Sequence, residues 1–171
     1  MSNPFSPAGI NKCLIIGTSF LIISCGNNGD AFTSKERAVV TDSVKALTSS
    51  IARNVSSEGP IAWLRYFETS PGFYMASAGR LVFPDNEAAK YFIKNSLVRA
   101  VTKIELRWNN IRIDPLSPSL ASIAAVFHED ITGNTGNKIV EDGYFTAIAE
   151  RSTAGWQLRN AHWSVIPADK K

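Results

Sequence analysis

Apolar residues recur at steps of three and four between residues 40 and 55, which predicts an amphipathic helix from about residue 34 to just before Gly59. Pro60 suits the first position of a second, short helix, because its missing N–H needs no partner there. Asp85 or Asn86 can cap a third helix, whose apolar positions continue to Val98. The apolar stripe of the first helix comprises Val40, Val44, Leu47, Ile51 and Val55.

Farther along the chain the apolar period changes from that of a helix to the alternation of a strand. Four long strands are expected, over residues 103–114, 120–132, 138–151 and 156–166. The segments between them carry Gly, Pro, Asn and Ser and are short enough to join antiparallel neighbours. A hairpin of two short strands, 73–77 and 80–83, is expected between the second and third helices. Helices first and a strand meander afterwards indicate the α+β class.

The segment before the first helix has the pattern of a signal peptide. Lys12 precedes a run of twelve mostly apolar residues, 13–24, and Cys25 follows this run. Spanning a bilayer core of about 30 Å takes roughly 20 residues, whereas the apolar region of a secretory signal needs only about 7–15. The alternatives are a buried apolar segment with an incidental cysteine, or a secretory signal that is cut elsewhere.

The run Leu21-Ile22-Ile23-Ser24-Cys25 resembles a bacterial lipobox, with Ile22 in the place usually held by Leu. The resemblance implies that the cysteine is lipidated and that residues 1–24 are a signal peptide, 25–32 a tether, 33–167 the domain and 168–171 a tail. Acylated Cys25 would then anchor the domain to a lipid bilayer of the cell envelope. Gly26 after the cysteine implies the outer rather than the inner membrane if the organism is Gram-negative. The domain would contain no thiol, because Cys13 leaves with the signal.

Composition and absent motifs narrow the classes of function. The chain has 171 residues, 44% of them hydrophobic, which suits one globular domain. Its charge is +3, and +2 once residues 1–24 with Lys12 are removed. Because no Lys/Arg-rich block is present, a nucleic-acid partner is not expected. The sequence has no GxGxxG, phosphate-binding loop, HExxH or GxSxG motif, so no cofactor and no metal are expected.

The order of elements resembles that of the SnoaL-like, nuclear transport factor 2-like superfamily. The sharpest motifs are Gly143 within the third long strand and the run from Gly155-Trp156 to His162-Trp163-Ser164, while Gly79-Arg80 in the hairpin is weaker. The resemblance implies three N-terminal helices packed in a strongly curved antiparallel sheet, a cone-shaped, cystatin-like half-barrel with a pocket at its open end. It also implies that the outer sheet face pairs two subunits into a homodimer. Such motifs identify a fold and leave the activity open.

Strand alternation collects polar side chains on one face of the sheet. If the turns close symmetrically, His128 lies near Asp142 and Tyr144 lies near His162. An apolar floor with a few convergent polar groups is typical of a small-molecule site. The polar group expected there comprises His128, Asp142, Tyr144, Asn160, His162 and Ser164, over a floor of Val126, Ile148, Trp156 and Leu158.

The candidate chemistry of this face is proton transfer. His162 and Asp142 are candidates for an acid–base pair with Tyr144 as a donor, the alternative being a histidine that is only structural. His128-Glu129-Asp130 is not expected to hold a metal, because consecutive strand residues face opposite sides. Aromatic side chains are candidates for ligand-binding walls or, alternatively, for the core: Trp63, Phe67, Tyr74 and Trp108.

Three functions follow as hypotheses. The first is an envelope lipoprotein whose domain binds a small apolar or amphipathic ligand. The second is a cofactor-independent isomerase, cyclase or dehydratase that uses His162 with Asp142. The third is a dimerising interaction module, because the other strand face is also apolar and a lone sheet would expose it to water. Binding or interaction is favoured over catalysis, because no strong catalytic signature is present. That second face comprises Phe145, Ala147, Ala161, Trp163 and Val165.

Overall fold

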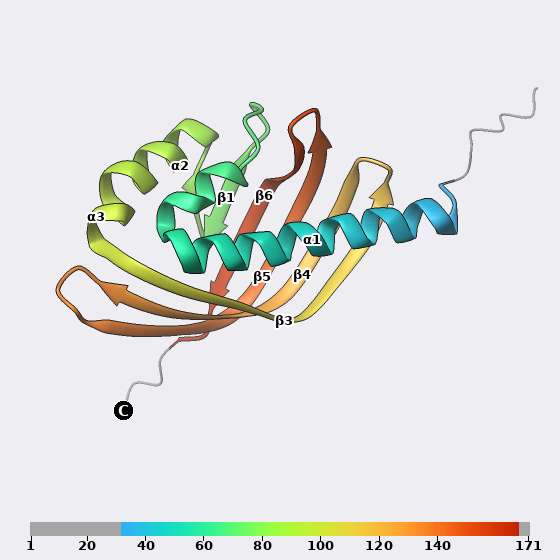
Figure 1. Ribbon diagram of the computed structural model, residues 1–171. Coiled ribbons are helices and arrows are strands. Elements are labelled where there is room, and N and C mark those ends of the chain that lie inside the picture. Colours follow the sequence, from blue (N-terminus) through green and yellow to red (C-terminus); the bar gives the residue numbers. More distant parts are fainter. Residues whose placement is uncertain (1–31, 168–171) are drawn as a thin grey trace, which may run out of the picture. The chain divides into compact units, whose positions relative to one another are not determined.

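The computed structural model describes residues 32–167 (Figure 1). The predicted signal peptide, Cys25 with most of the tether, and the tail lie outside these residues. The observed elements are α1 (Ser34–Glu58), the 3₁₀ helix η1 (Pro60–Arg65), β1 (Tyr74–Ser77), β2 (Arg80–Phe83), α2 (Asn86–Phe92), the π-helix η2 (Ile93–Leu97), α3 (Val98–Ala100), β3 (Val101–Ser117), β4 (Leu120–Gly133), β5 (Lys138–Ser152) and β6 (Gly155–Val165). This order confirms the α+β class. No helix within residues 32–167 is long and apolar enough to cross a membrane.

Local capping sets the helix boundaries. The hydroxyl of Thr33 accepts a hydrogen bond from the backbone N–H of Glu36, and the Glu36 carboxylate accepts one from the N–H of Thr33, so a capping box starts α1. Gly59, at φ 80°, ends it. The Asp85 carboxylate caps α2 by accepting from the N–H of Ala88 at 2.7 Å. The expected third helix is one run, α2–η2–α3, widened in its middle by the π turn.

The six strands form one sheet in the order β2-β1-β6-β5-β4-β3. Pairing is antiparallel except between β1 and β6, which run parallel. The sheet therefore differs from the expected antiparallel sheet in this one pair of strands. The segment before β1 fixes this direction, because Glu68 N–H donates to the carbonyl of Leu158 and Leu158 N–H donates to the carbonyl of Tyr66. The chain thus already runs alongside β6 before β1 begins.

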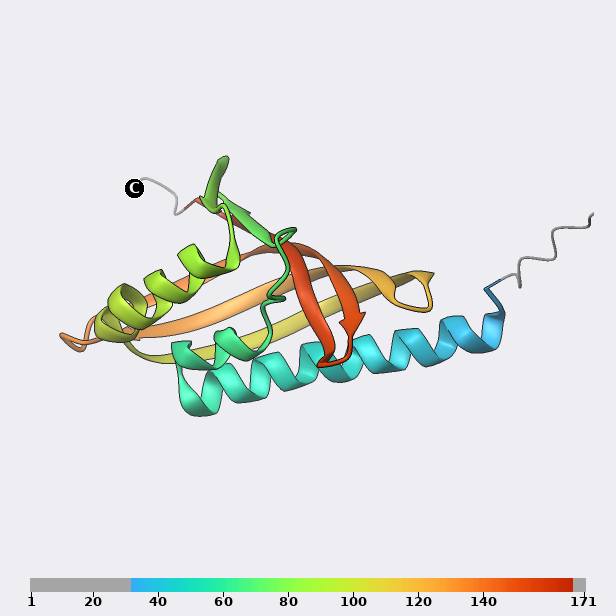
Figure 2. The same ribbon diagram turned by 90° about the horizontal axis from the view of Figure 1, so that it is seen from above.

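The sheet curves around the helices (Figure 2), and two of its strand positions have unusual backbone geometry or packing. Asn110 has φ 51° where the β3–β4 register shifts, and such a bulge bends a strand. Gly143 in β5 lies so close to its neighbours that an added Cβ would be 2.1 Å from the carbonyl oxygen of Ser164 and 2.6 Å from the ring of Phe127. Only a residue without a side chain fits there.

The helices cover the concave face of the sheet, and the core lies between the two layers (Figure 1). α1 contributes its predicted stripe, and the strands contribute bulky side chains such as Phe127, Phe145 and Trp163. The expectation that Phe145, Ala147, Ala161 and Trp163 lie on a wet face is therefore wrong, because these four residues are buried under the helices. The argument for an interaction module that was based on this face no longer holds.

Candidate functional site

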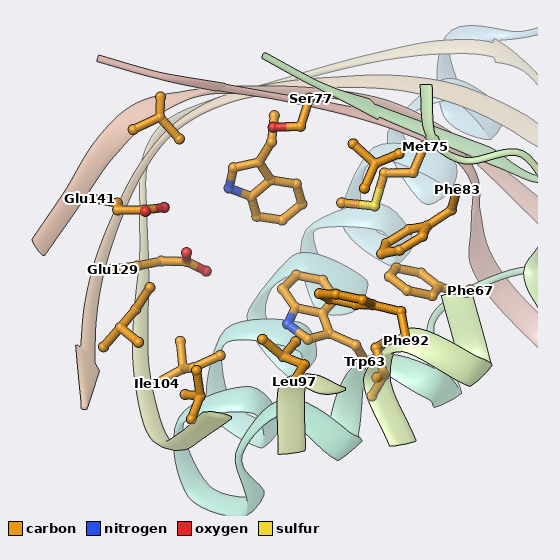
Figure 3. Close-up of a pocket in the computed structure, with 16 residues that line it drawn as sticks. Trp63, Phe67, Met75, Ser77, Phe83, Phe92, Leu97, Ile104, Glu129 and Glu141 are labelled. Atoms are coloured by element: carbon orange, nitrogen blue, oxygen red, sulfur yellow. The ribbon is translucent and has the colours of Figure 1, made fainter. Parts of the chain in front are cut away.

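A cavity of about 390 Å³ lies between the concave sheet face and the α2–η2 helical run (Figure 3). Thirteen of its sixteen lining residues are apolar, and three are polar: Ser77, Glu129 and Glu141. The apolar lining comprises Trp63, Phe67, Met75, Val82, Phe83, Phe92, Ile93, Leu97, Val101, Ile104, Ile131, Trp163 and Val165.

Trp63 and Phe67 are placed in the cavity by η1 and the residues that follow it. Their rings stack with centroids 5.8 Å apart, and Trp63 also meets Trp163 edge to face at 5.3 Å. The sequence predicted ligand contact for Trp63 and Phe67, and both line the cavity. The rings of Trp63, Phe67 and Trp163 therefore form an aromatic wall of the cavity.

Glu129 and Glu141 bring the only charged groups among the lining residues. They are direct cross-strand partners on β4 and β5, and Figure 3 shows both carboxyl groups directed into the cavity. The Glu129 side chain is buried, with 7% of its surface exposed. Within residues 32–167 neither carboxylate forms an ion pair.

Burial, together with the smaller effect of the nearby charge of Glu141, raises the pKa of Glu129 to about 7. The carboxyl group therefore changes its charge near neutral pH, whereas an exposed glutamate is ionised there. A buried acid with such a pKa inside a cavity is a candidate for ligand binding or proton transfer.

Neither Glu129 nor Glu141 was predicted as a site residue, although the strand pattern carries a signal for the pair. Glu129 shares its strand face with Phe127, and Glu141 shares its face with Gly143 and Phe145. In the sequence, this site is marked by a single acidic residue at the end of an otherwise apolar strand face. Glu129 was considered in the sequence only as one of three consecutive residues, His128-Glu129-Asp130, that are not expected to bind a metal.

The polar group predicted from strand alternation does share one face, but this is the outer face of the sheet. Asp142, Tyr144 and His162 are exposed, and none of the predicted polar residues lines the cavity. The strand alternation correctly placed these residues on a single face of the sheet. The helices, however, cover the opposite face. Of the predicted floor, Val126 and Ile148 are also outside, whereas Leu158 is fully buried because a bulge between Ile148 and Ala149 shifts the β5–β6 register.

The predicted contact between His128 and Asp142 is present. Nδ1 of His128 lies 2.7 Å from Oδ1 of Asp142, and its Nε2 lies 3.3 Å from Oδ2 of Asp130, which Arg107 also binds at 2.6 Å. The hydrogen bond to Asp142 raises the pKa of His128. This surface network contains no group of three residues placed to hold a metal, and the same is true of the rest of residues 32–167.

His162 and Asp142 are not brought together. His162 pairs with Thr146, which lies four residues from Asp142 along β5, so roughly 13 Å separates the two positions at about 3.3 Å per residue. Tyr144 pairs instead with Ser164. Direct proton transfer between His162 and Asp142 needs hydrogen-bond reach and has no geometric support here.

The remaining predicted residues lie in the core, at a strand bulge or on the outer sheet face, and none of them lines the cavity. The indole N–H of Trp108 donates to the carbonyl of Thr48 at 3.0 Å, and its ring packs on Phe145, so it belongs to the core. The side-chain oxygen of Asn160 accepts from the N–H of Ile148 at the bulge. Tyr74, Asn160 and His162 line a second hollow of about 360 Å³ on the outer sheet face.

Comparison with known proteins shows the fold. No protein-family profile and no curated protein matches the chain. A proposed scytalone dehydratase from Novosphingobium aromaticivorans superposes with a TM-score of 0.68 at 10% identity, covering 81% of this chain and 93% of the other. The hexachlorocyclohexane dehydrochlorinase LinA type 2 superposes with a TM-score of 0.63 at 14% identity, covering 81% of this chain and 95% of the other. A nuclear transport factor 2-like superfamily protein from Salmonella enterica superposes with a TM-score of 0.59 at 16% identity, again covering 81% of this chain and 95% of the other. The domain thus has the nuclear transport factor 2-like fold.

Proposed function

We propose that this domain binds a small, largely apolar molecule in the cavity between its sheet and its helices. The observation that carries the proposal is a space of about 390 Å³ with thirteen apolar residues among sixteen in its wall. Small-molecule sites typically enclose about 300–1,000 Å³ and combine an apolar lining with a few polar groups. Proteins of the same fold are named for a dehydratase and for the dehydrochlorinase of a small chlorinated ring, which supports a small organic ligand.

Calorimetry with the neutral probe 2-naphthylmethanol tests this proposal. The full chain is carried in lipid nanodiscs, and empty nanodiscs give the background from partitioning of the probe into lipid. Leu97→Trp should fill the cavity from its helical wall and weaken binding at least about tenfold, which corresponds to 1.4 kcal/mol. Leu116→Trp, at an exposed position on β3, is the control and should bind as wild type does. Equal affinity of all three proteins would exclude the cavity as the site.

A second candidate function is acid–base catalysis of the isomerase or dehydratase kind, with Glu129 as the proton carrier. The pKa of about 7 for Glu129 favours it, because a general base works best when its pKa lies near the working pH. Wild type should accelerate hydrogen–deuterium exchange next to the carbonyl of 2-tetralone, and Glu129→Gln should not. An unchanged exchange rate on addition of wild-type protein would reject this candidate.

Acylated Cys25 is proposed to hold the domain at the cell envelope, with the outer membrane as the destination if the organism is Gram-negative. The lipobox-like run before Cys25 supports this anchor. A homodimer through the outer sheet face is proposed as well. The outer hollow supports it, because Tyr74 and Thr146 expose side chains beside the apolar Ile148 there.

A further inference from the structure

We propose that the cavity ligand is a hydrophobic amine whose ammonium group lies between the carboxyl groups of Glu129 and Glu141 while its hydrocarbon part contacts the aromatic wall. This inference rests on the proposed binding function and specifies the chemical class of the ligand.

The strand register places Glu129 directly opposite Glu141. Directly opposed residues of an antiparallel pair have Cβ atoms about 4.5–5.5 Å apart, and Glu129 and Glu141 are such a pair on the cavity side. Both carboxyl groups are directed into the same space in Figure 3. An ionised carboxylate only accepts hydrogen bonds, while an ammonium group has three donors. One ammonium group can therefore serve both residues.

Without a bound cation, the two carboxyl groups destabilise the fold. Like charges directly opposite one another destabilise a sheet, and a buried charge without a partner is costly. Glu129 is 93% buried and has no basic partner within residues 32–167. A cation at this point reduces both costs, whereas a neutral ligand leaves them in place.

The rest of the lining also favours a cationic over an anionic ligand. It contains no Lys, Arg or His, so an anionic ligand would meet two carboxyl groups and no opposite charge. Ring faces attract cations through their quadrupole, most strongly those of tryptophan. The wall provides five aromatic side chains: Trp63, Phe67, Phe83, Phe92 and Trp163.

Proton release should accompany binding below neutral pH. Glu141 is the one titratable group that faces Glu129 in the described lining, Leu106 is its partner from β3, and the helices present apolar side chains. A bound ammonium group stabilises the ionised form of Glu129 and lowers its pKa from about 7. Amine binding at pH 6 should then release protons from Glu129, and at pH 8 it should release few.

The experiment compares 2-naphthylmethylamine with 2-naphthylmethanol by calorimetry on the full chain in nanodiscs of zwitterionic lipid. We expect the amine to bind at least about tenfold more tightly than the alcohol at pH 8, since a charge-assisted contact replaces a neutral one. Glu129→Gln and Glu141→Gln should each remove most of that preference. Glu87→Gln, which removes an exposed carboxylate on α2, should retain it. Repeating the titration at pH 6 in buffers of different ionisation enthalpy measures the proton release.

The outcomes separate this inference from the function on which it rests. Equal affinity for amine and alcohol in wild type would overturn the amine inference and leave small-molecule binding intact. Failure of both probes would reject both proposals. Retention of the amine preference in both glutamine variants would also overturn the inference. Glutamine has the shape of glutamate and removes an unfavourable charge, so both variants should fold, which a thermal melt checks.

Discussion

Glu129 and Glu141 are opposed across β4 and β5, and Glu129 is the more deeply buried of the two. Its folded-state pKa of about 7 exceeds the ordinary value of 4.5. Between these values the folded protein binds more protons than the unfolded chain does. The stabilising contribution of this group is therefore full at acid pH and is lost as the pH rises from 4.5 to 7.

Glu129→Gln should flatten this pH dependence. The wild type should lose up to about 3 kcal/mol of unfolding free energy from this group between pH 4.5 and 8, at 1.36 kcal/mol per pKa unit, and the variant should not. Urea denaturation at several pH values measures the difference. Glu87→Gln should follow the wild-type curve, and a parallel curve for Glu129→Gln would contradict the assignment.

Asp142→Asn should lower the pKa of His128. The folded-state pKa of His128 is raised above 6.5, chiefly by its hydrogen bond to Asp142, so this contact stabilises the fold below pH 6.5 and is lost as the pH rises through the folded value. NMR titration of the imidazole signals measures the pKa. The chain has two histidines, so His162→Gln assigns the signal. An unchanged titration midpoint in Asp142→Asn would show that the contact has no effect in solution.

Gly143→Ala should destabilise the domain more than the same change at a glycine that has open space around it. The new Cβ would overlap the backbone oxygen of Ser164 and the Phe127 ring, and overpacking of this kind costs about 1–3 kcal/mol or more. Gly79→Ala is the control, since its Cβ meets nothing within 4 Å and only the φ of 74° is strained, at about 1–2 kcal/mol. Similar melting temperatures for the two variants would contradict the packing argument.

Cys25→Ser should release the protein from membranes or block its processing. The serine oxygen cannot form the thioether on which lipidation depends, so the acyl chains proposed to hold the domain at the bilayer would be missing. Membrane fractionation and intact mass measure the change, with Cys13→Ser as the matched control that keeps the lipobox. Unchanged fractionation and mass for Cys25→Ser would refute the anchor.

Thr146→Arg should prevent dimer formation through the outer sheet face. An arginine beside Ile148 would place a charge in the centre of the contact, where its desolvation is costly. Light scattering with size-exclusion chromatography measures the mass, and Ala38→Arg on the exposed side of α1 is the control. A monomeric wild type, or a Thr146→Arg protein that remains dimeric, would exclude this interface.

Sequence periodicity predicted the elements well because helices and strands have different periods. The stripe from Val40 to Val55 is buried in α1, and all four long strands are present within a few residues of their expected ends. The contact of His128 with Asp142 was also predictable, because the turn between β4 and β5 is symmetric. Local rules were sufficient for these features.

The side of the sheet that encloses the site could not be predicted in the same way. Alternation separates Tyr144 from Phe145, but which of the two faces water depends on where α1 and η1 pack. The helices pack on the sheet face that carries the larger apolar side chains, so the polar face is the one exposed to water. The bulge near Ile148 then moved Leu158 to the core, and a one-residue shift of this kind leaves no mark in a single sequence.

The π turn of η2 makes the helical wall of the cavity sensitive to chain length. Ile93 and Leu97, at its two ends, both line the cavity. Removing one residue between them would restore ordinary α-helical winding and turn the side chains on one side of the deletion by about 100° around the helix axis relative to those on the other side. A single-codon deletion could therefore give the cavity a new outline while every strand stayed in place, a route by which related chains could diverge in ligand choice without altering their folding core.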